Sequence, residues 1–93
     1  MVIGLVEISL SIPHARSLKD KRAVLRSLKD RAVGRMNVSV AEVADQDRWQ
    51  RARLAFVTVA ATRDVVERRI AEISTFVRSD PRYVLIDLAT SLL

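Results

Sequence analysis

The chain has no cysteine, only two glycines and a single histidine, and just four of its 93 residues are aromatic. Without cysteine it forms no disulfide and has no thiolate to act as a nucleophile or metal ligand. Two glycines are too few for a glycine-rich phosphate-binding loop. The lone His14 gives a metal site little support. We therefore expect no metal, no other cofactor and no catalytic residue.

Long hydrophobic runs are also missing. No segment approaches the roughly 20 apolar residues that a membrane-spanning helix needs. The first ten residues include Glu7 and no basic side chain, so we do not expect a secretory signal peptide. Absence of cysteine fits a reducing compartment. These features predict a cytoplasmic protein with no membrane partner, folded as one domain over residues 1–93.

What the sequence does have is positive charge, concentrated in one segment. Residues 16–35 hold eight basic and two acidic residues, a net charge of +6. The rest of the chain holds eight basic and nine acidic residues, a net charge of −1, and together they give the overall +5. A charge imbalance confined to one segment indicates an anionic partner.

Residues 2–12 alternate between two faces, which predicts a β-strand. The more apolar register should face the core, which leaves Ile3, Leu5 and Glu7 on the open side of the sheet. Ser17, followed three residues later by an acid, predicts the start of a helix, and Gly34 predicts its end.

Three more strands are predicted over residues 36–44, 51–61 and 82–90, with a second helix capped by Thr62. The resulting order, βαββαβ, is typical of the ferredoxin-like α+β fold. That fold has a four-stranded antiparallel sheet in the order 4-1-3-2, with two helices on one face.

The alternation within the later strands predicts which side chains face the helices. In strand 82–90 we expect Val84, Ile86 and Leu88 inside and Leu85 outside. In strand 51–61 the pattern does not decide between Leu54 with Phe56 and Val57 with Val59. If the first pair faces inward, the uncovered face carries an apolar patch, which favours a homo-oligomer, most simply a dimer. The interface predicted in this way consists of Ile3, Leu5, Val57, Val59 and Leu85.

Four basic residues of the first helix follow one another at spacings of three and four, which aligns them along one flank. They are Lys19, Arg22, Arg26 and Lys29. If RNA binds, this flank is the expected phosphate-contacting surface, because the first strand has no aromatic residue on which a base can stack. The alternative is an ordinary solvated helix face. Arg48, Trp49 and Arg51 would add contacts, unless Trp49 pins its own loop against the core.

Three segments resemble the YlxP-like family of bacterial proteins of unknown function: residues 17–22 (SLKDKR), 37–43 (NVSVAEV) and 46–52 (QDRWQRA). The resemblance covers nearly the whole chain. It implies a ferredoxin-like fold, a bacterial cytosol and genes near those for translation and ribosome maturation, and it implies no established activity. Of its motif positions, we interpret Lys21, Glu42, Gln46 and Asp47 as a structural cluster that fixes a loop.

Together these patterns favour a small non-catalytic accessory protein that binds RNA or ribosomal assemblies through its basic first helix. The alternative is a homo-oligomeric interaction or scaffold module that associates through its open sheet face. A small-ligand or phosphoester site ranks third.

Overall fold

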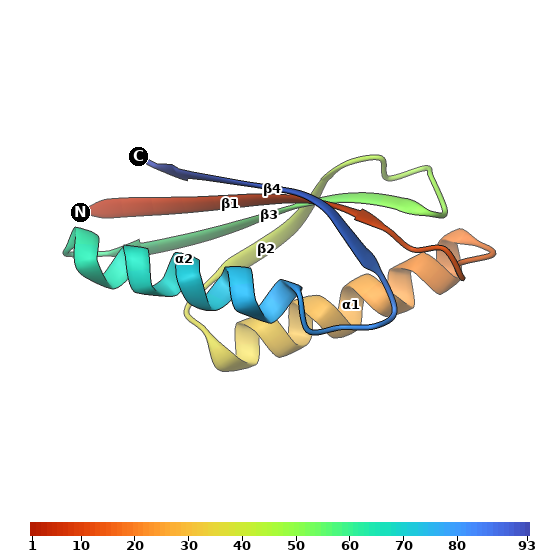
Figure 1. Cartoon of the computed structure of the whole chain (residues 1–93), viewed down its shortest axis with the longest axis horizontal. Coiled ribbons are helices and arrows are strands. Elements are labelled where there is room, and N and C mark those ends of the chain that lie inside the picture. Colours follow the sequence, from red (N-terminus) through yellow and green to blue (C-terminus); the bar gives the residue numbers. More distant parts are fainter.

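The computed structural model has a four-stranded antiparallel sheet with both helices on one of its faces (Figure 1). The elements are β1 (Val2–Ser11), α1 (Leu18–Arg35), β2 (Ser39–Ala44), β3 (Arg51–Ala60), α2 (Arg63–Val77) and β4 (Val84–Leu92). The strand order β2-β3-β1-β4 is the predicted 4-1-3-2 read from the other edge. The predicted element and sheet orders are therefore confirmed, consistent with a ferredoxin-like fold. Neither helix is long and apolar enough to cross a membrane.

The core lies between the helices and alternate residues of the central strand β1. Val6, Ile8 and Leu10 are fully buried on this side, as the alternation predicted. Gly4 shares their face. A Cβ atom there would lie 2.5 Å from Cγ1 of Val66 on α2, so only glycine lets the helix approach β1 this closely.

Strand β3 shows which of its two possible registers faces the core. Its antiparallel pairing with β1 directs Leu54 and Phe56 toward the helices, where both are buried. Val57 and Val59 lie on the uncovered face, with exposed fractions of 40% and 49%. The alternative that the sequence left open is thereby resolved, and the uncovered face has an apolar patch.

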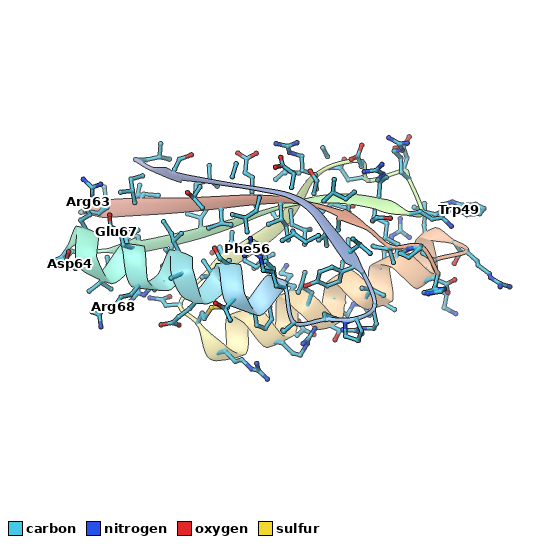
Figure 2. The ribbon with its side chains drawn as sticks, in the orientation of Figure 1. Trp49, Phe56, Arg63, Asp64, Glu67 and Arg68 are labelled. Atoms are coloured by element: carbon cyan, nitrogen blue, oxygen red, sulfur yellow. The ribbon has the colours of Figure 1, made fainter.

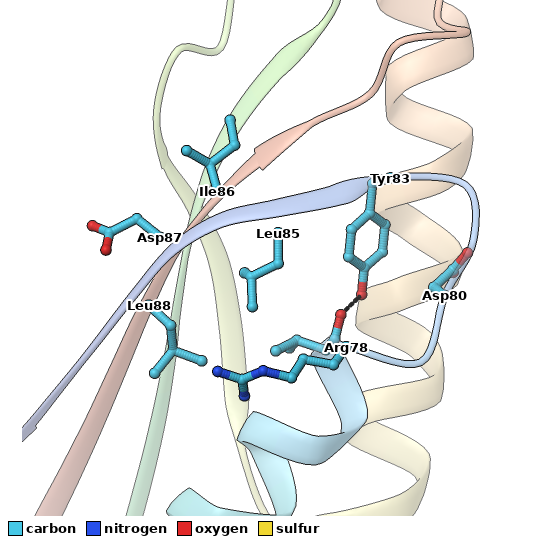
Figure 3. A pocket seen from close by; sticks show the side chains of 8 residues that line it. Arg78, Asp80, Tyr83, Leu85, Ile86, Asp87 and Leu88 are labelled. Carbon is cyan, nitrogen blue, oxygen red and sulfur yellow. Dashed lines mark hydrogen bonds between the residues drawn. The ribbon is translucent and has the colours of Figure 1, made fainter.

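Strand β4 differs from its prediction. Leu85 was expected outside but packs against the core, whereas Val84 and Ile86 were expected inside and are exposed; only Leu88 faces inward as predicted. Figure 3 shows Leu85 and Ile86 on opposite sides of the strand. The cause is a β-bulge: two inward positions of β1 lie opposite Leu85 and Leu88, which are three residues apart rather than two.

The ends of several elements also differ from their predictions, and β4 spans Val84–Leu92 rather than residues 82–90. Helix α1 ends at Arg35, past Gly34, and the Met36 amide donates a hydrogen bond to the Ala32 carbonyl, 2.9 Å away. Neither glycine has a positive φ angle, so Gly34 is not the left-handed cap that the sequence suggested. Strand β2 begins at Ser39, three residues later than expected.

A buried carboxylate joins α1 to the turn before β4. Asp80 accepts hydrogen bonds from the Arg31 side chain at 2.6 Å and from the backbone and side chain of Arg82 at 2.6–3.1 Å. The Arg82 hydrogen bonds are the main reason that the pKa of Asp80 falls to about 2. In the adjacent hollow, the Tyr83 hydroxyl donates to the Val77 carbonyl (Figure 3), and burial raises its pKa to about 12.

The low pKa of Asp80 predicts a pH-dependent contribution to stability. The carboxylate is stabilised by folding, so its contribution is present above pH 4 and is lost as the pH falls toward 2. We expect Asp80→Asn to lower the free energy of unfolding by about 1–2 kcal/mol at pH 7, since its arginine partners are partly solvated. Urea unfolding of both proteins from pH 7 to pH 2 measures this. A difference that stays constant over that range would contradict the assignment.

Candidate nucleic-acid interface

Two side-chain to backbone hydrogen bonds cap the start of helix α1. The Ser17 hydroxyl accepts from the Asp20 amide at 3.1 Å, and the Asp20 carboxylate accepts from the Arg16 amide at 2.9 Å. The Ser17 cap is the one that the sequence predicted, whereas the acid accepts from Arg16, one residue before the Ser17 amide that a capping box would use. Leu28 and Ala32, one turn apart, are buried against the sheet. The cap and this apolar face together fix which flank α1 presents to solvent.

That flank carries four basic side chains, which we call the basic ridge: Lys19, Arg22, Arg26 and Lys29. All four are exposed. None of them takes part in an ion pair or donates a side-chain hydrogen bond within the protein. Their charges are thus not neutralised internally and are available to an external anion.

Helix α2 presents a different outer surface. Figure 2 shows Arg63, Asp64, Glu67 and Arg68 together near its first turns, at the opposite end of the molecule from Trp49. Arg63 and Glu67 form an ion pair of 2.9 Å one turn apart. Basic and acidic side chains are mixed on this helix, so it offers no counterpart to the basic ridge.

A hollow of about 470 Å³ lies between α1 and the edge strand β2. One side is formed by the ridge residues Arg22, Arg26 and Lys29. The rest of its lining consists of Leu25, Asp30, Val40, Ala41, Glu42 and Leu54. The basic ridge is therefore not a flat surface, because it borders a recess that also contains apolar side chains.

Lys21 lies on the inner side of α1 and is only 1% exposed. Its ammonium group forms an ion pair with Glu42, in which Nζ lies 2.6 Å from Oε2 but outside hydrogen-bond geometry. The same ammonium group donates a hydrogen bond of 2.6 Å to the backbone carbonyl of Asp45. Asp45 has a φ of 62°, in the left-handed region. Gln46 and Asp47 are exposed and make no hydrogen bond or ion pair with this group. The structure thus brings together two of the four residues of the predicted cluster.

Asp45 is the residue of this cluster that sequence reasoning missed. Lys21 recognises its backbone carbonyl, which any residue type provides. The only signal in the sequence is the aspartate itself, which tolerates a positive φ better than most residue types. The contact joins the first turns of α1 to the loop between β2 and β3.

Trp49 in this loop is 53% exposed and projects from one end of the molecule (Figure 2). The alternative that it pins the loop against the core is therefore wrong. Gln50 instead ties this loop to the segment between β1 and α1, since its side-chain amide donates to the carbonyls of Pro13 at 3.3 Å and Ala15 at 3.1 Å. The indole remains free for an external contact.

Arg48 and Arg51 line a shallow hollow together with Trp49, at the end of the molecule where α1 begins. Arg48 lies 3.9 Å from the Asp45 carboxylate, and both groups are well solvated, so this pair neutralises little charge. Arg51 is exposed and forms no ion pair. Arg48 and Arg51 are thus two further exposed cations at this end of the molecule, with Arg51 on the uncovered face of β3.

The uncovered face of the sheet carries four of the five predicted interface residues. Ile3 lies opposite Val59, and Leu5 lies opposite Val57. Leu85 is on the other face, because of the bulge in β4. Beside the patch, Arg53 and Glu7 form an ion pair of 3.0 Å.

Comparison with known proteins finds relatives along almost the whole chain. Residues 3–90 match a family described as "Protein of unknown function (DUF503)". The protein YlxP of Bacillus subtilis (strain 168), described as uncharacterized, is 36% identical over 80 residues. The match covers 86% of this chain and 87% of that protein.

Proposed function

This chain belongs to the DUF503 family of proteins of unknown function, as its resemblance to YlxP-like proteins predicted, and we propose that it is a non-catalytic protein that binds RNA through the basic ridge. One observation carries the proposal: four aligned, exposed basic side chains have no partner within the protein. Surface cations of this kind contact phosphates, which supply most of the affinity in sequence-independent RNA binding.

The dimensions of the ridge fit a nucleic-acid strand. Lys19 and Lys29 are ten residues apart, which corresponds to about 15 Å along a helix axis. A stacked strand advances about 3.4 Å per nucleotide, so the ridge spans several phosphates. An RNA that ran past the start of α1 and around this end of the sheet would meet Arg48 and then Arg51 on the uncovered face. The exposed Trp49 indole between them offers a surface on which a base stacks.

The proposal is tested by anisotropy of a labelled single-stranded RNA mixed with the protein at 50–200 mM salt. Each phosphate contact adds about −0.7 to the slope of log affinity against log salt. Four contacts predict a slope near −3 and roughly a 50-fold loss of affinity over this range. Absence of binding at the lowest salt, or affinity independent of salt, would contradict the proposal.

A second candidate, self-association through the uncovered sheet face, is supported by the exposure of Val57 and Val59. Two copies meeting there would bury the apolar patch. They would also keep the +6 segments of both α1 helices on their outer sides, without like charges facing each other. Sedimentation equilibrium at micromolar concentration tests this candidate, and a single 10.5 kDa species would exclude it.

A further inference from the structure

The hollow between α1 and β2 has the features of a small-ligand site as well as of a phosphate-binding surface. Its volume of about 470 Å³ lies in the range of ligand pockets, about 300–1,000 Å³. Leu25 supplies partly exposed apolar surface above the buried side chains of Val40 and Leu54, and Arg22 and Arg26 lie at its side. Unpaired nucleobases stack in proteins on aromatic side chains or on planar arginine guanidinium groups, and this hollow offers the guanidinium groups.

Asp30 is unusual in this setting. It is an exposed carboxylate that lines the hollow next to the ridge, and it has no ion pair or side-chain hydrogen bond within the protein. A carboxylate repels phosphate, so it adds nothing to backbone binding. An ionised carboxylate only accepts hydrogen bonds, and its two oxygens accept best from two adjacent donors. The second carboxylate of the hollow, Glu42, is already paired with Lys21.

Among the four RNA bases, guanine alone presents two adjacent N–H donors, N1–H and the 2-amino group, on its Watson–Crick edge. Adenine and cytosine present an amino donor beside a ring acceptor, and uracil presents one N–H between two carbonyls. Unpaired bases are read by hydrogen bonds to this edge. Asp30 therefore matches guanine and mismatches the other three bases.

We propose that the hollow between α1 and β2 binds one unpaired guanine base of an RNA strand, with Asp30 accepting from its Watson–Crick edge. The inference rests on the proposed function, since the ridge holds the phosphates of the same strand. It deepens that function by making the protein selective for single-stranded RNA with an unpaired guanine.

The test compares heptamers of uridine that differ only at the central position, which is guanosine, inosine or adenosine. We expect about tenfold tighter binding with guanosine than with adenosine, the discrimination typical of a bidentate base contact. Inosine lacks the 2-amino group and should bind with intermediate affinity. Asp30→Asn should abolish the preference without weakening binding of the adenosine heptamer. The matched control Asp64→Asn, on α2, should retain it.

The outcomes separate this inference from the proposed function. Salt-dependent binding with equal affinity for the guanosine and adenosine heptamers would overturn the guanine site and leave RNA binding in place. A guanine preference unchanged by Asp30→Asn would also overturn the assignment to this hollow. Failure of all three heptamers to bind at low salt would overturn the proposed function, and the guanine site with it.

Discussion

Replacing Lys21 by methionine is expected to lower the free energy of unfolding by about 3 kcal/mol. Lys21 is almost fully buried, and its ammonium group is the partner of both the Glu42 carboxylate and the Asp45 carbonyl. Methionine fills a similar volume, so the loss comes from leaving these two acceptors without their cation. The loop that carries Trp49 also loses its tie to α1.

Urea unfolding at pH 7 measures this effect, with Lys19→Met as the matched control. Lys19 lies on the same helix but is exposed and unpaired, so its substitution should change stability by less than about 0.5 kcal/mol. Adding Glu42→Met to Lys21→Met should recover part of the loss, because it removes the uncompensated carboxylate. Equal stability of the Lys21 and Lys19 variants would show that the buried ion pair does not hold this region together.

Several parts of the structure were predictable from local patterns. The alternation in β1 identified its buried face, and Ser17 identified the start of α1 within one residue. Lys21 stood out as a charged residue on the apolar side of a helix. The spacing of the basic ridge also placed it on one exposed flank. Each of these features depends only on residues a few positions apart.

Features that depend on distant pairings could not be predicted. The bulge in β4 arises from its register with β1, and an extra residue in a pairing leaves no mark in the alternation of β4 itself. For this reason Leu85 was placed on the wrong face. The partners Arg31 and Asp80 are 49 residues apart, and the Asp-Pro sequence indicated only a turn.

The central claim is that the basic ridge is an RNA-binding surface, and it predicts that Arg22→Glu with Arg26→Glu weakens RNA binding about 100-fold. Each substitution removes a phosphate contact and places a negative charge at the same position, an effect of about tenfold per residue. The magnitude of the salt slope should also fall by about 1.4, because two phosphate contacts are lost. Both arginines are exposed and unpaired, so the fold should be retained.

The control is Arg63→Glu with Arg68→Glu on α2, which lowers the net charge by the same amount, from +5 to +1. This control distinguishes the effect of where the charge lies from the effect of the net charge, because net charge alone also changes association with RNA. Circular dichroism of all three proteins shows whether each retains its helices and sheet.

The most direct measurement is the affinity of the wild type and these two variants for one single-stranded RNA, each determined over the same salt series. Loss of affinity and of salt slope in the α1 variant, with near wild-type behaviour of the α2 variant, is the predicted result. Equal weakening of both variants would show that only net charge matters. Unchanged binding by the α1 variant would show that RNA is held elsewhere.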